Sequence, residues 1–377
     1  MNNKSVTNYL KEDKIADLEK FIEENEISSE DYFNIFLYFK NKRQFEISKK
    51  YLIKAVELDP DNLQYKLILS TICLAINDFK SGWKYYEERV MLPNYSRRNL
   101  LRWTGKEKYE KCVVFVEQGY GDTFMFARFL PLLKLHFKYI TFCVSKELLS
   151  LFKKINLNID NVVTEINPKD YDCYLDLASL PFLLNLNTEK DLNNNWNYME
   201  KNYTEQPLNN KKLNVGFCLN GRIDTDYEKT RAIDIEKLLP LFNNKNIVMH
   251  SLYKTNDNTY QKLLKEKKII QYDIFDDFGK TAQLIKNMDI IITSDTSIVH
   301  LAGSLGKKTF LLLPKLTDWR WKTKGEKTYW YDSLEIIRQE RQGEWEEPTL
   351  ILKEKINEYT KQEKNTFKNL FCSLFQK

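Results

Sequence analysis

The segment DIIITSDTSIVHLAG, residues 289–303, joins an apolar run to a helix-forming run through a short polar turn. The β-branched run at 289–293 is typical of a strand buried on both faces, as in parallel sheets. Small and polar residues then open a helix, whose N-terminus favours anionic groups. The segment therefore predicts a parallel α/β sheet with a ligand site where this strand ends.

Similar runs lie on both sides of this segment. The second half of the chain has further strand-like runs at 213–221, 246–253, 268–274 and 308–314. The first half has strand-like runs at 112–119, 139–144 and 171–177, with a helix expected at 122–136. A polar stretch at 185–212 separates the two series, so we expect two Rossmann-like domains facing a cleft.

Residues 6–92 contain only helical patterns. FLYFKNKRQF (36–45) aligns with STICLAINDF (70–79) at a spacing of 34 residues, and Tyr51 then aligns with Tyr85. This period is typical of tetratricopeptide helix pairs, which stack to bury their apolar faces. A generic helical bundle is the alternative. A repeat domain here would offer a docking surface for a partner chain.

These patterns divide the chain into four expected parts. They are a tetratricopeptide-like helical domain (1–95), an N-terminal Rossmann-like domain (96–205), a C-terminal Rossmann-like domain (206–347) and a C-terminal helix (348–377). The last helix has an apolar stripe, which we expect to pack back across the domains; a membrane anchor is the alternative.

Composition excludes several classes of function. The six cysteines are widely spaced and form no CxxC pair, and only three histidines occur among 377 residues, so no metal site is expected. A net charge of +5 with interspersed signs does not indicate a nucleic-acid binder. No apolar signal segment and no run of about 18 apolar residues is present, so we expect a cytoplasmic protein without a transmembrane segment.

The first candidate site follows the strand at 112–119. Two glycines in this turn would let a ligand approach the backbone, and Asp122 could act as a general base. An ordinary helix cap is an equally good interpretation of Asp122. The candidate cleft residues of this turn are Glu117, Gln118, Gly119, Gly121 and Thr123.

The second candidate site is the turn of the opening segment. Hydroxyls and amides at the start of the helix would suit a diphosphate. His300, one helical turn further on, could serve the same site or be a structural residue. The candidate diphosphate-binding residues here are Asp295, Thr296, Ser297 and His300.

Other candidates lie in loops. Gly221–Arg222, Arg231 and Lys254 follow strands of the second series, where cations could neutralise a diphosphate or simply remain solvated. Trp319 and Arg320 belong to a dense aromatic and basic run that predicts a pocket rim or an interdomain seam, with core packing as the alternative for the tryptophans.

Several of these motifs together resemble a known family. They occur in the order seen in tetratricopeptide-containing bacterial glycosyltransferases, which are related to the ADP-heptose lipopolysaccharide heptosyltransferases. Ala232 stands where that family usually has Ser, and Tyr253 where Gln is frequent. The resemblance reaches to about residue 347 and rests on EQGYGDTFMFARFLP, TRAIDIEKLLPL, SDTSIVHLAGSLGK, LLLPKLTDWRW and WYDSLEIIRQERQGEW.

The resemblance implies a GT-B fold and metal-independent, inverting sugar transfer from a nucleotide sugar, with no further cofactor. It implies that residues 96–205 form the acceptor domain and residues 206–347 the nucleotide-sugar-binding domain. It also implies that Asp122 is the base, that the segment from Asp295 to His300 binds the donor diphosphate, and that Arg231 assists. A protein acceptor such as flagellin or another surface protein is expected to dock on the repeats. The alternative is a non-catalytic tetratricopeptide scaffold that carries a degenerate transferase domain.

Overall fold

The computed structural model describes residues 5–92, 95, 99–206, 208, 212–221, 226–274 and 276–374, and side chains of 226–228 and of residues beyond 361 are outside the description. The described chain forms two compact units. Unit 1 comprises Met1–Gly105, Ser179–Leu192 and Asp318–Lys324, and unit 2 comprises Lys106–Ala178, Asn193–Thr317 and Gly325–Lys377. The four domain boundaries expected from the sequence remain predictions.

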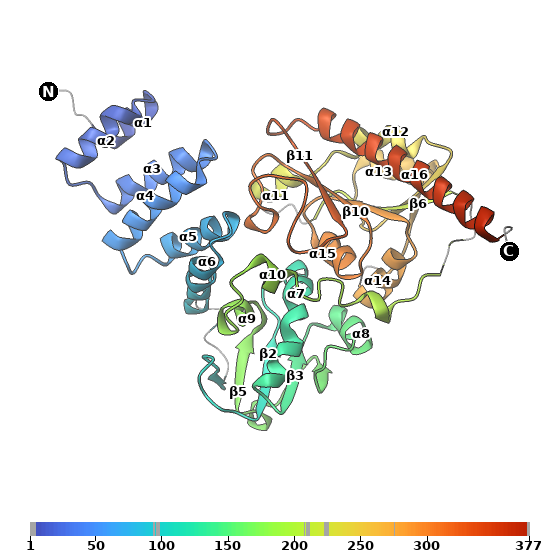
Figure 1. Ribbon diagram of the computed structural model, residues 1–377, viewed down its shortest axis with the longest axis horizontal. Helices are drawn as coiled ribbons and strands as arrows, with labels where there is room; N and C mark the ends of the chain where they lie inside the picture. The colour runs from blue at the N-terminus through green and yellow to red at the C-terminus, as the bar shows by residue number, and fades with distance from the viewer. Residues whose placement is uncertain are drawn as a thin grey trace. The chain divides into compact units, whose positions relative to one another are not determined.

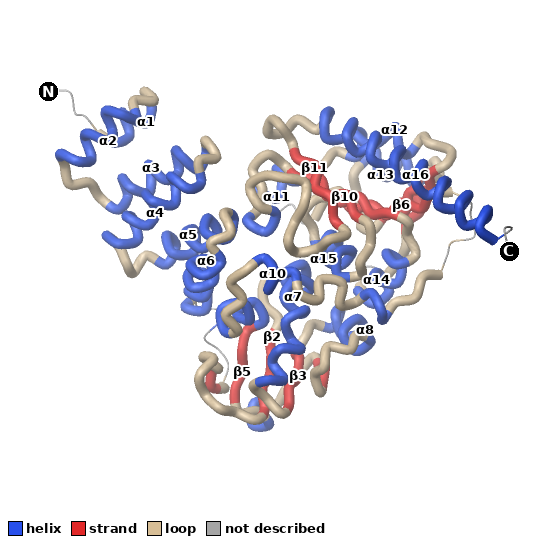
Figure 2. Tube along the Cα trace, in the orientation of Figure 1, coloured by secondary structure: helices blue, strands red, loops and turns tan. Residues whose placement is uncertain are grey.

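Unit 1 is built mainly of helices, which Figure 2 draws in blue. They are α1 (Val6–Lys11), α2 (Ile15–Glu24), α3 (Ser29–Asn41), α4 (Phe45–Leu58), α5 (Leu63–Ala75), α6 (Phe79–Tyr86), the 3-10 helix η1 (Glu87–Met91) and α9 (Leu180–Leu183), with the short strand β1 (Leu101–Arg102). The helix α10 (Glu189–Asn193) lies at the end of the second segment.

The repeat expected from the sequence is visible as two successive helix pairs. The pair α3–α4 and the pair α5–α6 begin 34 residues apart, and the helices within each pair are in contact. Their turns also match, because Arg43 and Asn77 both have a left-handed backbone, at φ 59° and 65°. Phe36, Leu52 and Leu69 are fully buried between the helices. Whether the stack has the tetratricopeptide arrangement stays a prediction.

Unit 2 begins with a parallel sheet in the order β5-β2-β3-β4, with β2 paired in parallel to both β5 and β3. Its elements are β2 (Lys111–Phe115), α7 (Tyr120–Phe126), η3 (Ala127–Leu135), β3 (Tyr139–Cys143), α8 (Lys146–Lys154), β4 (Asn161–Val163), η4 (Pro168–Asp170) and β5 (Cys173–Asp176), followed by η5 (Leu177–Ser179) and η6 (Glu200–Asn202).

The second sheet of unit 2 is also parallel throughout its described pairs. Its elements are β6 (Leu213–Cys218), α11 (Asp226–Arg231), η7 (Ile235–Leu238), α12 (Leu239–Phe242), β7 (Ile247–Ser251), α13 (Asn258–Lys265), β8 (Ile269–Gln271), α14 (Phe278–Lys286), β9 (Ile290–Thr293), α15 (Ser297–Ser304), β10 (Thr309–Leu313), η8 (Trp319–Trp321, in unit 1), β11 (Leu334–Arg338) and α16 (Glu346–Leu374).

The strand order of this sheet is β8-β7-β6-β9-β10-β11. Chain order therefore runs outward from β6 in one direction and from β9 in the other, which is the 3-2-1-4-5-6 order of a Rossmann fold. The direction reverses between β6 and β9, and ligands of such sheets bind beyond the carboxyl ends of the two strands at this switch point. The first sheet has an equivalent reversal between β2 and β5. The α/β class with two parallel sheets is confirmed.

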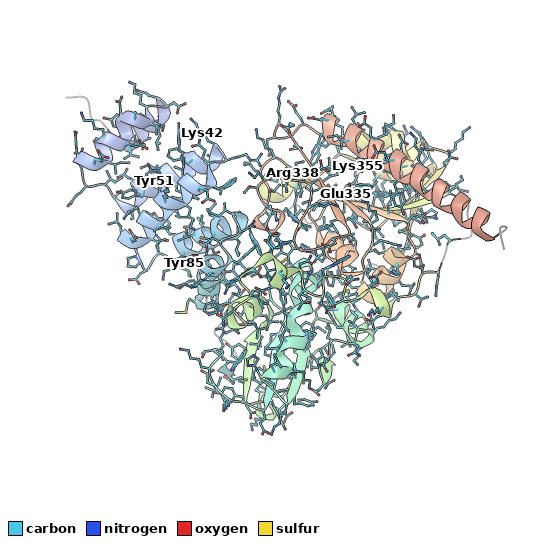
Figure 3. All side chains as sticks on the ribbon, viewed as in Figure 1. Lys42, Tyr51, Tyr85, Glu335, Arg338 and Lys355 are labelled. Atoms are coloured by element: carbon cyan, nitrogen blue, oxygen red, sulfur yellow. The ribbon has the colours of Figure 1, made fainter. Side chains whose placement is uncertain are left out.

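Helices cover both faces of the second sheet. In Figure 1, α12, α13 and α16 lie on one side of β6 and β10, and α14 and α15 lie on the other. Leu352 and Ile356 of α16 are buried in the same core as Val215 and Ile290 of the sheet. Lys355 also bonds to Glu335 of β11 at 3.1 Å (Figure 3). The described part of the C-terminal helix thus packs on the second sheet.

Several elements differ from the sequence expectation. The helix expected at 122–136 changes from α7 into the 3-10 helix η3, because Pro131 cannot donate the hydrogen bond that an α-helix interior requires. The sequence patterns also missed β4, which has three residues, and β11, whose residues lie within a motif interpreted as a pocket rim.

No helix in the described residues is long and apolar enough to cross a membrane.

Candidate functional site

The two candidate turns lie side by side in unit 2, because α7 packs against α15. The contact is closest at Gly121. A Cβ atom on this glycine would lie 2.8 Å from Cδ2 of His300 and 3.5 Å from the Cα of Ser297. Only a residue without a side chain fits between the helices here. The start of α7 is thus held against the first turn of α15.

Asp122 closes the first turn of α7. Its Oδ2 accepts a hydrogen bond from the backbone N–H of Gly119 at 3.2 Å, and the side chain is half-buried. Thr123 is buried, and its hydroxyl donates to the carbonyl of Gly119 at 3.3 Å. The structure therefore supports the capping interpretation, and the same contact fixes the carboxylate at the start of the helix. The catalytic role of this carboxylate remains a prediction.

The loop before α7 is set by two other residues. Glu117 follows β2, and its carboxylate accepts from the backbone N–H of Ala178 at 2.9 Å, just after β5. Gln118 has a left-handed backbone, with φ 60°, which is uncommon for a residue with a side chain. Such a conformation persists only where the surrounding contacts enforce it. The turn at the first switch point is thus a constrained one.

The second turn is shaped by Thr296, the N-cap of α15. Its Oγ1 accepts from the N–H of Ile298 at 3.3 Å and lies 3.1 Å from the hydroxyl of Thr293. Ser297 is half-buried at the first position of the helix. The partial positive charge of the α15 N-terminus therefore lies at the switch point between β6 and β9, as expected for a site that binds an anion.

Gly221 and Arg231 join this turn from the β6 side. A Cβ on Gly221 would lie 3.3 Å from an Nη atom of Arg231 and 3.7 Å from Cγ2 of Thr296. Arg231 also pairs with the buried carboxylate of Asp295 at 4.0 Å. A cation, a carboxylate and a helix N-terminus thus meet at one switch point. Arg222, beside Gly221, lies outside the described residues.

The thiol of Cys218 lies beneath this turn, where the hydroxyl of Thr296 is 3.6 Å from its sulfur. Burial raises the pKa of Cys218 to about 11, although the hydrogen bond from Thr296 acts in the opposite direction. The thiol is therefore neutral at physiological pH and serves as packing rather than as a nucleophile.

The remaining candidates are placed elsewhere. Lys254 follows β7 and forms an ion pair with Asp273, with 48% of its own side chain exposed. Trp319 belongs to unit 1, where its ring meets those of Trp83 at 5.7 Å and Tyr86 at 5.9 Å. Arg320 stacks on Trp319, with its guanidinium carbon 4.4 Å from the ring centroid. The acceptor role expected for Trp319 and Arg320 stays a prediction.

The sequence patterns did not predict the buried polar side chains of Tyr331 and Arg128 next to His300. The Nδ1 of His300 lies 3.0 Å from the hydroxyl of Tyr331, and the guanidinium of Arg128 lies 4.6 Å from the ring centroid of Tyr331. Arg128 is 2% exposed and bonds to the carbonyls of Met125 and Trp330 at 2.9 and 2.7 Å. The sequence feature that could have indicated this group is the arginine inside the apolar run FMFARFLP, because its apolar neighbours favour burial of the arginine as well.

No family model matches the chain, and no curated protein matches it either. Among solved structures, the chain is similar to E. coli ADP-heptose LPS heptosyltransferase II, with 14% identity and a TM-score of 0.47, covering 67% of this chain and 99% of that one. It is also similar to E. coli heptosyltransferase WaaC with ADP-2-deoxy-2-fluoro heptose (10%, 0.45, covering 66% and 99%).

A third similar structure is the glycosyl transferase family 9 protein from Veillonella parvula, with 13% identity and a TM-score of 0.41, covering 62% of this chain and 88% of that one. All three solved structures are glycosyltransferases.

Proposed function

We propose that the protein is a glycosyltransferase of GT-B type that moves a sugar from a nucleotide-diphosphate sugar to an acceptor hydroxyl, with inversion and without a metal ion. The observation that carries the proposal is the contact of two turns at Gly121. It brings a fixed carboxylate, Asp122, next to a helix N-terminus that suits a diphosphate. The motif resemblance and the switch-point position of both turns support the same function.

The proposed donor site is the N-terminal end of α15. There the helix N-terminus and Arg231 would stabilise the negative charge that develops on the diphosphate as its bond to the sugar breaks. Thr296 and Ser297 would contact the phosphate oxygens. Lys254 remains a second candidate cation, in spite of its ion pair with Asp273.

The proposed base is Asp122. The acceptor oxygen would attack the anomeric carbon from the face opposite the diphosphate, and the carboxylate would take the hydroxyl proton as the new C–O bond forms. The nucleoside diphosphate then leaves with the electron pair of the broken bond. The anomeric configuration inverts because a single displacement occurs.

The proposed acceptor is a protein, such as flagellin or another surface protein, and its docking site is the repeat surface of unit 1. The paired helices α3–α4 and α5–α6 support this role, because stacked helix pairs are common surfaces for binding protein segments. The proposed location of the enzyme is the cytoplasm.

The test is sugar transfer by wild-type protein and by the variant Asp122→Asn. Asn keeps an oxygen that can accept from the N–H of Gly119, so the start of α7 is preserved, but the amide cannot act as a base. Mass spectrometry of candidate surface proteins incubated with nucleotide sugars should show the added sugar mass with wild type. The variant should bind the donor equally well and transfer at least 100-fold more slowly, roughly the contribution of one general base. Near-normal transfer by the variant would remove Asp122 from the role of base.

A further inference from the structure

His300 is enclosed on both edges of its ring and is 3% exposed. The Nδ1 edge meets the hydroxyl of Tyr331 at 3.0 Å. The opposite edge faces the start of α7, because a Cβ on Gly121 would lie 2.8 Å from Cδ2 and 3.5 Å from Nε2. The imidazole therefore connects a buried tyrosine with the turn that carries Asp122.

Tyr331 is itself fixed in place. A Cβ on Gly303 would lie 2.4 Å from the Tyr331 ring, so the ring lies directly on the backbone of α15. The guanidinium of Arg128 lies over the same ring at 4.6 Å. The phenol cannot move away from His300 without losing both contacts.

The residues around Tyr331 determine whether Tyr331 or His300 donates the hydrogen in the bond between them. Burial raises the pKa of Tyr331, against the lowering effects of the Arg128 charge and of hydrogen bonds from Ser304 and Arg128, and the charge of Asp122 adds to the increase. The phenol therefore keeps its proton at neutral pH. Arg128 has only donors, and the hydroxyl of Ser304 donates to the carbonyl of Phe124 at 3.5 Å. Nδ1 of His300, at 3.0 Å, is the acceptor that lies in direct hydrogen-bond distance of the phenol, provided that the imidazole is neutral.

We infer that Tyr331 is a positioning residue that donates its phenolic hydrogen to Nδ1 of His300 and so fixes the imidazole as the Nε2–H tautomer. The ring then presents an N–H donor on the edge that faces Gly121 and the first turn of α7. Arg128 assists by holding the Tyr331 ring and by disfavouring a second positive charge nearby. The catalytic consequence rests on the proposed function: the fixed ring holds the turn that carries Asp122 against α15.

The tautomer can be measured without any activity. Protein labelled with ¹⁵N in its imidazole rings has only three histidines, His136, His250 and His300, and His300→Gln assigns the third signal. At about pH 8, above the ordinary histidine pKa of about 6.5, the wild-type His300 signals should show hydrogen on Nε2 alone. Hydrogen on Nδ1 would overturn the inference.

Two variants provide a matched comparison. Tyr331→Phe removes the hydroxyl and keeps the ring on Gly303, so His300 should become a mixture of tautomers. Tyr260→Phe removes another buried hydroxyl, which donates to Oε1 of Gln271 at 2.7 Å, so its His300 signals should match wild type. Identical His300 signals in Tyr331→Phe and wild type would contradict the inference. If Tyr331→Phe does not fold, the wild-type tautomer alone decides.

Kinetics then test the catalytic consequence. Tyr331→Phe should lower kcat roughly tenfold, about the contribution of one hydrogen bond, and leave KM for the donor nearly unchanged. Tyr260→Phe should retain the wild-type kcat. An unchanged kcat in Tyr331→Phe would overturn the catalytic part. If no nucleotide sugar binds wild-type protein, the proposed function fails, whereas the tautomer measurement stands on its own.

Discussion

The backbone of Gly121 lies directly against the imidazole of His300, so closely that a single methyl group at this position would come within 2.8 Å of Cδ2. The two residues belong to helices that follow strands of different sheets: α7 follows β2 of the first sheet, and α15 follows β9 of the second. Their contact therefore positions the two proposed halves of the reaction, the base and the diphosphate site, relative to one another.

Gly121→Ala should separate these helices. The added methyl cannot be accommodated without a shift, so we expect a loss of about 1–3 kcal/mol in the free energy of unfolding, measured by urea denaturation, and slower transfer. Gly119→Ala is the matched control, because a Cβ there meets its nearest atom, Oδ2 of Asp122, at an ordinary 3.5 Å. Equal effects of the two substitutions would show that the close approach at Gly121 is unimportant.

Thr296→Ala should weaken the start of α15. The side chain caps the helix through Ile298, and loss of such a cap typically costs about 1 kcal/mol of stability. The proposed phosphate contact of the hydroxyl would be lost as well, so nucleotide affinity should fall. Thr296→Ser keeps the hydroxyl and should bind like wild type in calorimetric titrations. A Ser variant as weak as the Ala variant would argue against a role for the hydroxyl.

Arg231→Lys should lower the affinity for nucleoside diphosphate roughly tenfold, because lysine keeps the charge but loses bidentate geometry. Lys254→Ala tests the second cation, because its removal should weaken binding if Lys254 also binds the diphosphate. Calorimetric titration of both variants at one ionic strength separates the roles. Wild-type affinity in Arg231→Lys would mean that Arg231 serves only Asp295.

His250 should make the fold sensitive to acid. Burial lowers the pKa of His250 from 6.5 to about 4, while its ring nitrogens contact Tyr272 at 2.8 Å and Asn214 at 3.2 Å. Since the folded state holds the neutral ring, the unfolded state binds the proton first as pH falls. Stability is therefore lost between pH 6.5 and about 4, by about 3 kcal/mol in total.

The measurement is the urea midpoint as a function of pH in wild type and in His250→Gln. The variant should be less stable at neutral pH, because Gln cannot reproduce the packing of the ring, but its stability should fall less steeply over this window. Parallel pH profiles for the two proteins would assign the acid sensitivity to other groups.

Much of the fold could be predicted from the sequence because buried parallel strands are continuous apolar runs. DIIIT (289–293) and TFLLL (309–313) are such runs, so strands were predicted there. The 34-residue repeat was predicted from aligned residues, and the structure shows matching left-handed turns at Arg43 and Asn77. The strand β4 could not be predicted, because its three residues form no period. The residues of β11 lie near aromatic residues that could form a pocket rim, an interdomain seam or part of the core, so no strand was predicted there.

The candidate site was predictable only in part. Local turns place Asp122 and Thr296 at strand ends, so their positions follow from short segments. The Tyr331–His300 hydrogen bond joins residues 31 apart, and Arg128 bonds to Trp330 across 202 residues. Contacts of that length depend on how the helices pack, which no local pattern encodes.

The proposed function requires that a nucleoside diphosphate binds at the switch point between β6 and β9. Its most direct test is a thermal-shift panel of nucleoside diphosphates and nucleotide sugars against wild-type protein and Arg231→Lys. We predict that one nucleotide raises the Tm of wild type in a concentration-dependent way, equivalent to about 2.7 kcal/mol at a hundredfold excess over Kd, and raises that of the variant less. No shift with any nucleotide, or an equal shift in both proteins, would contradict the claim.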